Sequence, residues 1–181
     1  REIASTDMVE KSIEFGAVPT ATAPGSTLQG VRSALDATTT LVEYVVREPL
    51  VGAFVVTLDA VRWFELPISP AELALRCQKF RAHTAGPIQA LTPASDEFVL
   101  RRDAATSNLE LLGEALVEPL RSALVGDRLV IVPHASIHCL PFHAFPSGGG
   151  WLSAEFEISY APRAAMFAIG SRHDVITARP V

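Results

Sequence analysis

The sequence has few lysines, more acidic than basic residues, and no long apolar run. Only Lys11 and Lys79 are lysine among 15 basic residues, and 20 acidic residues bring the formal net charge to −5. This balance argues against a surface built mainly for nucleic acid, which requires a basic field. No stretch reaches the roughly 18 apolar residues of a membrane-spanning helix, and no secretory signal pattern opens the chain. We therefore expect neither nucleic acid nor a membrane among its partners.

Cysteine is also scarce, since Cys77 and Cys139 are the only two in 181 residues. Two cysteines do not make the disulfide framework of a secreted domain, so a reducing, cytoplasmic setting is expected. With 49% apolar and 19% charged residues, the chain has the composition of a folded domain and not of a disordered tail. It begins at Arg1 without a methionine and ends on Arg179-Pro180-Val181, which indicates a fragment of a longer protein.

Short runs of β-branched and aromatic residues predict the strands of a sheet. These runs lie at residues 41–46, 54–57, 61–66, 128–133 and 155–160. The second and third flank Leu58-Asp-Ala60, which suits a hairpin turn. Within residues 61–66, alternate positions place apolar side chains on both faces, so the sheet is expected to be covered on both sides.

Two amphipathic patterns predict helices. The first begins at Ser69-Pro70-Ala71-Glu72, which has the form of a capping box, and Leu73, Cys77 and Phe80 then share one face. The second runs from Leu109 to Leu124 in steps of three and four, and Pro119 should kink or restart it. Residues 84–102, between the two, are predicted to form a loop. Shorter helices are expected after Ser26 and at residues 164–169.

These elements divide the chain at residue 37. Residues 1–37 are predicted to form an N-terminal linker and a short helix, because Val18–Gly25 is rich in proline and small residues. Residues 38–181 interleave strands with helices, and the hairpin at 54–66 makes the sheet mixed. This order indicates an α/β fold, a mixed β-sheet flanked by helices.

The densest group of reactive side chains is a short segment after the strand at 128–133, which holds His134, His138, Cys139 and His143. Histidine and cysteine are the usual zinc ligands, but a spacing of four shares a face only on a helix, and prolines bracket this segment. A Cys139–His nucleophile pair is a second interpretation, although sequence neighbours rarely reach the necessary geometry. A buried junction is favoured, in which the histidines bond backbone carbonyls and Cys139 fills apolar space.

The remaining titratable side chains do not indicate a site. Cys77 falls on an apolar helix stripe, His83 lies near a helix C-terminus, and His173 lies in the polar tail. Glu110, Glu114 and Glu118 are spaced as a solvated helix face. The sequence contains no Gly-x-Gly-x-x-Gly, no P-loop and no Gly-x-Ser-x-Gly. We therefore assign no catalytic, cofactor-binding or metal-binding residue.

The order of several motifs resembles that of the CHAT domain, a caspase-like peptidase family often fused to tetratricopeptide repeats. The resemblance covers about residues 38–170 and is clearest in the run from Leu129 to Phe145. That family commonly shows an apolar strand, Pro, a polar residue, Gly, and then a hydrophobic-His-x-Leu-Pro-Phe run. Here Ala135 replaces the glycine and Arg163 replaces a common serine. The other matching segments are Leu41–Val46, Ala53–Thr57, Val61–Leu66, the helix with Pro119-Leu120, and Ile158–Pro162.

The resemblance implies a caspase-like α/β fold, but it brings no catalytic residue with it. CHAT peptidases use a His–Cys dyad in motifs like Ala-Thr-His-Gly and Ser-Ala-Cys-Glu-Thr, and neither motif occurs in this sequence. His138 matches a recurrent family position that is interpreted as structural. The resemblance therefore predicts a pseudo-peptidase lobe, inactive alone, which supports a downstream peptidase lobe of the same bacterial-type parent chain.

Two other function classes stay open at this point. The chain could be a scaffold pseudo-peptidase that binds a protein partner and never cleaves, which the sequence beyond Val181 would decide. It could also be a small metal-binding domain that uses His134, His138, Cys139 and His143, which elemental analysis for zinc would decide. The peptidase hypothesis implies a polypeptide substrate and no cofactor.

Overall fold

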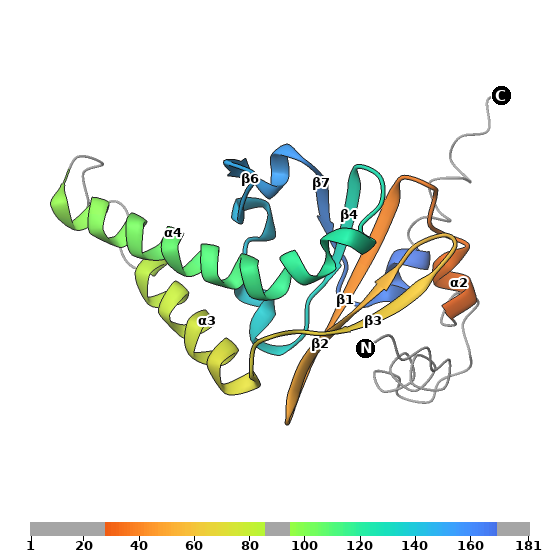
Figure 1. Ribbon diagram of the computed structural model, residues 1–181, viewed down its shortest axis with the longest axis horizontal. Helices are drawn as coiled ribbons and strands as arrows, with labels where there is room; N and C mark the ends of the chain where they lie inside the picture. The colour runs from red at the N-terminus through yellow and green to blue at the C-terminus, as the bar shows by residue number, and fades with distance from the viewer. Residues whose placement is uncertain (1–27, 86–94, 170–181) are drawn as a thin grey trace.

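The computed structural model describes residues 28–85 and 95–169, which build one five-stranded mixed sheet with helices on both faces (Figure 1). The strand order across the sheet is β3-β2-β1-β4-β7. The strands are β1 (Thr39–Arg47), β2 (Leu50–Val56), β3 (Val61–Glu65), β4 (Arg128–Val132) and β7 (Glu157–Tyr160). The predicted α/β fold with a mixed sheet is confirmed.

The first three strands form an antiparallel meander. The predicted hairpin is confirmed, because β2 and β3 pair from Val56↔Val61 to Gly52↔Glu65. β1 and β2 form a second hairpin that the sequence pattern did not reveal, connected at Glu48–Pro49 through a cis peptide bond. That hairpin extends β2 to Leu50, four residues before the predicted start.

β4 and β7 add to the other side of β1 as parallel strands. β4 pairs with β1 from Thr39↔Arg128 to Glu43↔Val132, and with β7 from Arg128↔Glu157 to Ile131↔Tyr160. After its first residue β4 is buried on both faces, as expected for a central parallel strand. Gly126 has a φ of 69° just before β4, and a Cβ there would lie 2.0 Å from the Thr38 carbonyl oxygen, so only glycine fits this turn.

Two long antiparallel helices cover one face of the sheet, and Figure 1 shows them side by side. α3 (Pro70–Thr84) begins as predicted, because the Ser69 side chain accepts a hydrogen bond from the Glu72 amide. Glu72 does not close the box but pairs with Arg76 one turn later at 2.7 Å. Leu73, Cys77 and Phe80 are buried toward the core, as predicted.

The prediction of a loop over residues 84–102 is wrong at its C-terminal end. α4 (Asp96–Leu116) begins at Ser95, whose hydroxyl accepts a hydrogen bond from the Phe98 amide. Two acidic residues, Asp96 and Glu97, follow in the first turn, where they complement the helix dipole. The first two turns of α4 carry few buried apolar residues, so the periodicity appears only from Leu109 onward.

Pro119 restarts the helix, as expected. α4 ends at Leu116, and a 3-10 helix, η2 (Glu118–Ala123), follows with the proline in its first turn. A proline ring has no amide hydrogen and clashes with the preceding turn, which explains why α4 does not continue. Glu110, Glu114 and Glu118 are exposed, which confirms the solvated acidic face.

The core has two layers, one on each face of the sheet. On the first face, α3, α4 and η2 pack against Val42, Tyr44 and Ala53, and the Tyr44 hydroxyl donates to the Leu116 carbonyl at 3.0 Å. On the second face, α2 (Leu28–Arg32) and helical residues 164–169 pack against Leu41 and its neighbours. The sheet is therefore covered on both sides, as predicted.

Some predictions lie outside the described residues. These are the linker in residues 18–25, the Ser26 cap, His173 and the end of the chain. The domain boundary at residue 37 stays a prediction.

Candidate functional site

The segment with the histidines and Cys139 follows β4 and forms two short 3-10 helices. These are η3 (Ala135–Cys139) and η4 (Phe142–Ala144). Four apolar side chains bury the segment against the first face of the sheet, and the polar side chains between them are left nearer the surface. The buried four are Ile137, Leu140, Phe142 and Phe145.

His134 completes the hydrogen bonding of β1 beyond the end of β4. Its Nδ1 accepts a hydrogen bond from the Val46 amide at 3.0 Å. β4 ends at Val132 opposite Glu43, so the imidazole takes the place that a longer strand would fill. An Nδ1 acceptor requires the neutral ring to carry its proton on Nε2. His134 therefore acts as a positioning residue between two strands.

Ala135 adopts a left-handed backbone conformation with a φ of 51°. Glycine adopts this conformation easily, whereas a side chain with a Cβ costs about 1 kcal/mol or more. The position is the one at which the resembling family commonly has glycine. The structure thus gives a physical reason for the family pattern and shows that this chain retains the geometry without the residue.

The expectation that the histidines bond backbone carbonyls is wrong. His134 accepts from an amide instead, and His134, His138 and His143 are all exposed. The four apolar anchors take the buried positions of this segment, and the imidazoles lie at the surface. Within residues 28–85 and 95–169, no group of three or more histidine, cysteine or carboxylate side chains is placed to hold a metal ion.

The two cysteines meet between α3 and η3. Cys139 is half-buried, and its thiol donates to the Ser136 carbonyl at 3.1 Å. Burial is the main cause that raises the pKa of the Cys77 thiol to about 12, and Cys139 adds to it. Ser136 and Arg81 have smaller effects that lower this pKa. Cys77 is therefore a protonated core thiol, as predicted. Among the described residues, no histidine hydrogen-bonds to either sulfur.

An aromatic cluster ties this segment to β1 and β7. The ring of Phe142 lies 5.4 Å from that of Tyr44, 4.8 Å from that of Phe145 and 6.4 Å from that of Tyr160. The Tyr160 hydroxyl accepts a hydrogen bond from the Phe142 amide at 2.8 Å. The Leu-Pro-Phe run and β7, which are separate in sequence, thus form one packed unit.

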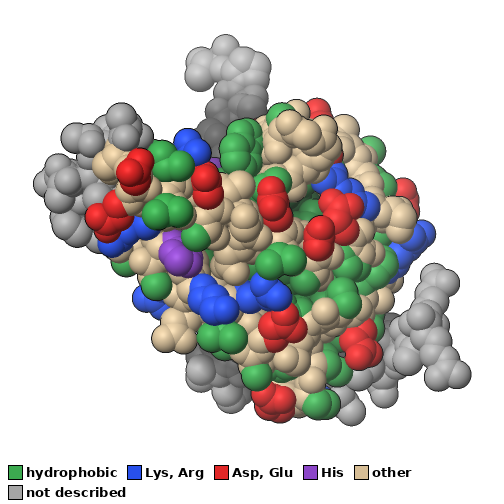
Figure 2. All heavy atoms as spheres, turned by 60° about the vertical axis from the view of Figure 1, so that its left-hand side comes forward, with side chains coloured by type: hydrophobic (Ala, Val, Ile, Leu, Met, Phe, Trp, Pro, Cys, Tyr) green, Lys and Arg blue, Asp and Glu red, His purple; other side chains and the backbone are tan. Residues whose placement is uncertain are grey.

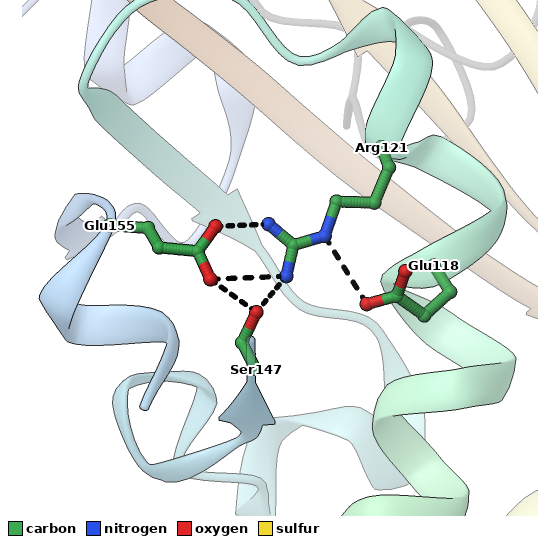
Figure 3. A network of polar contacts seen from close by, with 4 residues as sticks. All are labelled: Glu118, Arg121, Ser147 and Glu155. Atoms are coloured by element: carbon green, nitrogen blue, oxygen red, sulfur yellow. Dashed lines mark hydrogen bonds and ion pairs between the residues drawn. The ribbon is translucent and has the colours of Figure 1, made fainter. Parts of the chain in front are cut away.

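Arg121 of η2 is the centre of a polar network that sequence reasoning missed (Figure 3). Its guanidinium bonds Glu118 at 3.2 Å and also contacts Ser147 and Glu155. The Ser147 hydroxyl donates to the Glu155 carboxylate, which lowers the pKa of Glu155, and Arg121 lowers it further. Ser147 belongs to a small hairpin, β5 (Pro146–Ser147) and β6 (Gly150–Trp151), and Glu155 follows η5 (Leu152–Ala154).

This network fixes the hairpin to η2, and its groups satisfy one another. A guanidinium and two carboxylates that are already paired have a structural role, not a reactive one. No local motif could have revealed the network, because Arg121 lies 34 residues from Glu155 in the sequence.

Glu43 in β1 is a second group that the sequence pattern did not reveal. It is half-buried on the second face of the sheet, and burial raises the pKa of its carboxyl. The described residues offer this carboxylate no hydrogen bond and no ion pair. An alternating strand pattern predicts burial but not whether a carboxylate finds a partner.

A hollow of about 250 Å³ lies at the opposite edge, where the parallel strands begin. Its polar groups already pair with one another, since Arg128 contacts Asp36 at 3.2 Å and Glu157 at 3.6 Å. The Thr39 hydroxyl lowers the pKa of Asp36 most, and the Thr38 amide and hydroxyl add to this effect. The charged side chains that line this hollow are therefore already paired with one another.

None of the described helices combines the length and hydropathy needed to cross a bilayer. No curated protein matches the chain at a significant level. The model of the CHAT domain family matches residues 106–180. The matched segment contains the C-terminal half of α4, η2, β4, the histidine segment, the hairpin and β7, and β4 and β7 form one side of the five-stranded sheet. The match supports a partial CHAT domain over residues 106–180, and this is the caspase-like peptidase family that the sequence motifs resemble.

Proposed function

We propose that this chain is the N-terminal, non-catalytic portion of a CHAT-type cysteine peptidase. It supports and positions a downstream lobe of the same parent chain, which carries the His–Cys dyad and acts on a polypeptide. The observation that carries this proposal is that a CHAT-family segment folds here around thiols that have no histidine partner among the described residues. A dyad requires both groups within hydrogen-bond reach.

The outer edge of β7 is consistent with a downstream lobe that adds to the sheet. β7 is the last strand of the sheet, and no other described strand pairs with its outer side. The strands β1, β4 and β7 run parallel, and helical residues 164–169 then pack on the second face. A right-handed crossover through that helix would lay a further parallel strand beside β7. Tyr160 at this edge is 47% exposed, although its ring also contacts the aromatic cluster.

The surface favours a polypeptide over nucleic acid. On the side where α3 and α4 project, Figure 2 shows acidic, basic and apolar side chains interspersed, without a large field of one sign. A nucleic-acid surface requires a continuous basic patch. We also propose a reducing, cytoplasmic location, which the two free thiols support, and association with tetratricopeptide repeats in the parent protein.

The test compares the 181-residue chain with its parent protein. A peptidyl acyloxymethyl ketone, which alkylates catalytic thiols, should label the parent outside this chain and leave Cys77 and Cys139 unlabelled. Cys139→Ala should leave cleavage of casein by the parent unchanged, because the thiol is a packing group. Labelling of Cys139, or loss of cleavage in a folded Cys139→Ala protein, would contradict the proposal.

The same experiment decides between peptidase and scaffold. A parent protein with no labelled thiol and no cleavage, whose sequence beyond Val181 lacks His-Gly and Cys-Glu motifs, would be a scaffold pseudo-peptidase. A parent protein that is labelled at a downstream cysteine is the peptidase proposed.

A further inference from the structure

Glu43 places a carboxylate among apolar side chains on the second face of the sheet. Its cross-strand neighbours are Phe54 on β2 and Val132 on β4, which are 6% and 3% exposed. Side chains alternate along a strand, so Glu43 shares its face with Leu41 and Val45, both of which pack in the second core layer. The carboxylate therefore lies between two buried apolar columns.

No described residue gives the Glu43 carboxylate a partner that would offset the free-energy cost of its burial. No hydrogen bond or ion pair joins its carboxylate to any other described residue, and the pKa of the carboxyl is raised by desolvation alone. By contrast, the described carboxylates Asp36, Glu72, Glu118 and Glu155 all pair with an arginine. Burying a charge without a partner costs about several kcal/mol. A cation that binds from outside would offset this cost at Glu43.

Trp63 borders the same area of the face. Its ring lies 4.7 Å from that of Phe54, the cross-strand neighbour of Glu43. The indole also leans over Gly52, because a Cβ there would meet two of its ring carbons at 2.2 and 2.3 Å. Gly52 pairs with Val45, two residues after Glu43, so the ring extends from β3 toward β1. Trp63 is half-buried and thus keeps part of its surface accessible.

Glu43 and Trp63 are both cross-strand neighbours of Phe54, one on each side of it, and a carboxylate and an indole on one face together have the chemistry of a cation site. The carboxylate accepts charge-assisted hydrogen bonds, and the ring face attracts a cation by its quadrupole. A planar guanidinium uses both, because it can bond the carboxylate through two N–H groups while it stacks on the ring. Glu65, which pairs with Gly52 on the neighbouring strand, adds a second negative charge on this face.

The position in the sheet is also that of a ligand site. Glu43 is level with Val132, the last residue of β4, and Ile131 pairs with Tyr160, the last residue of β7. Ligands of open α/β sheets bind beyond the carboxyl ends of parallel strands. Glu43 is thus level with the carboxyl end of β4, although β1 itself continues to Arg47.

We propose that Glu43 and Trp63 form a binding site for an arginine side chain of a polypeptide, with the guanidinium on the Glu43 carboxylate and against the Trp63 ring. The site rests on these side chains alone, so it would operate in a peptidase or in a scaffold.

Trp63 allows the site to be tested directly. In a Trp151→Phe background Trp63 is the sole indole, and its fluorescence is titrated with the peptide acetyl-Gly-Arg-Gly-amide. We expect a saturable change, no change with the citrulline peptide, which has the same shape without the charge, and weaker binding of the lysine peptide. Equal affinity for the citrulline peptide, or for the lysine peptide, would overturn the assignment of a guanidinium site.

Glu43→Gln should weaken the arginine peptide at least tenfold. Glu110→Gln, an equal change of charge on an exposed part of α4 that packs on the other face, should alter affinity less than twofold. Urea denaturation shows whether Glu43→Gln is folded, and Glu43→Asp, which keeps the charge, should retain measurable binding. A folded Glu43→Gln protein with unchanged affinity refutes the site, while the proposed peptidase role would stand.

Discussion

At the scale of single residues, three positions in this protein depart from ordinary conformation or packing, and each has a local cause. Ala135 is held left-handed because Ile137 and Leu140 must be buried just after a strand ends. His134 turns back to bond the Val46 amide. Glu43 is half-buried because its neighbours on β1, Leu41 and Val45, belong to the core. For Ala135 and Glu43, the local cause predicts how a substitution changes the free energy of unfolding.

Ala135→Gly should stabilise the protein. Glycine relieves the left-handed strain, which is about 1 to 2 kcal/mol, but loses part of this gain through its larger entropy in the unfolded chain. We expect a net increase of about 0.5 to 1 kcal/mol in the free energy of unfolding, measured by urea denaturation. Ala144→Gly in η4 is the matched control and should destabilise, since no positive φ is found there. A loss of stability in Ala135→Gly would contradict the strain argument.

Glu43→Gln should change how stability depends on pH. Burial raises the folded pKa of Glu43 above its unfolded value, so the folded state binds more protons between the two values. The wild-type protein therefore loses stability as pH rises through this window, and the loss is complete above the folded pKa. Glutamine does not titrate, so the free energy of unfolding of the variant should increase relative to that of the wild type from acid toward neutral pH. Denaturation at several pH values checks this, and a constant difference would contradict it.

At the scale of elements, side-chain caps and one arginine network set the boundaries. Ser69 and Ser95 begin the two long helices, and Pro119 ends α4 and begins η2. Arg121 then attaches the β5–β6 hairpin to η2 through Ser147 and Glu155. The hairpin is only two residues on each side, so this contact matters more to its position than its own strand pairing does.

Arg121→Ala should loosen the hairpin with a modest global effect. Its side chain is 27% exposed, and ion pairs at the surface contribute about 1 kcal/mol or less to folding. We expect a small drop in the free energy of unfolding and faster amide exchange at residues 146–151. Arg128→Ala, which removes another surface pair, is the control and should not affect exchange in the hairpin.

The loss of stability in Arg121→Ala should depend on pH. The pKa of Glu155 is lowered in the folded protein, so its contribution is present above the unfolded pKa and disappears as pH falls through the folded pKa. The difference between Arg121→Ala and wild type should therefore shrink in acid, below the usual range of a glutamate. A difference that is as large in acid as at neutral pH would show that the loss is one of packing.

At the scale of the whole molecule, the described sheet ends in an antiparallel hairpin on one side and in parallel strands on the other. β3 is a short edge strand at one end, and β7, with its parallel neighbours, forms the other end. The Glu157 amide donates to Asp127 and the Ala161 amide to Ile131, so the amides of Ile158 and Tyr160, which alternate with them, point outward. An added strand would bond these two amides.

Hydrogen exchange should show whether β7 receives a further strand. In the 181-residue chain the amides of Ile158 and Tyr160 should exchange faster than those of Glu157 and Ala161. In the parent protein the same two amides should become protected by at least tenfold, because a parallel neighbour would bond them. Exchange that is equally fast in both proteins would exclude strand addition at this edge, while slow exchange in both would show that another group already covers it.

The sequence by itself determined the class of the fold and much of its order. Strand propensity, the Ser69 cap and the periodicity after Leu109 are local signals, and they predicted the mixed sheet and both long helices because each depends on neighbouring residues. The motif order around Leu129–Phe145 also predicted the CHAT domain, which the family match over residues 106–180 supports.

Only the tertiary structure decided which polar groups have partners. The bond from Val46 to His134, the contacts of Arg121 with Ser147 and Glu155, and the contact of Cys77 with Cys139 join residues 26 to 88 positions apart. The unpaired state of Glu43 is visible only when both neighbouring strands are in place. Local patterns report burial, because burial follows the period of the element. Pairing of charges depends on long-range register, which no single segment of the sequence contains.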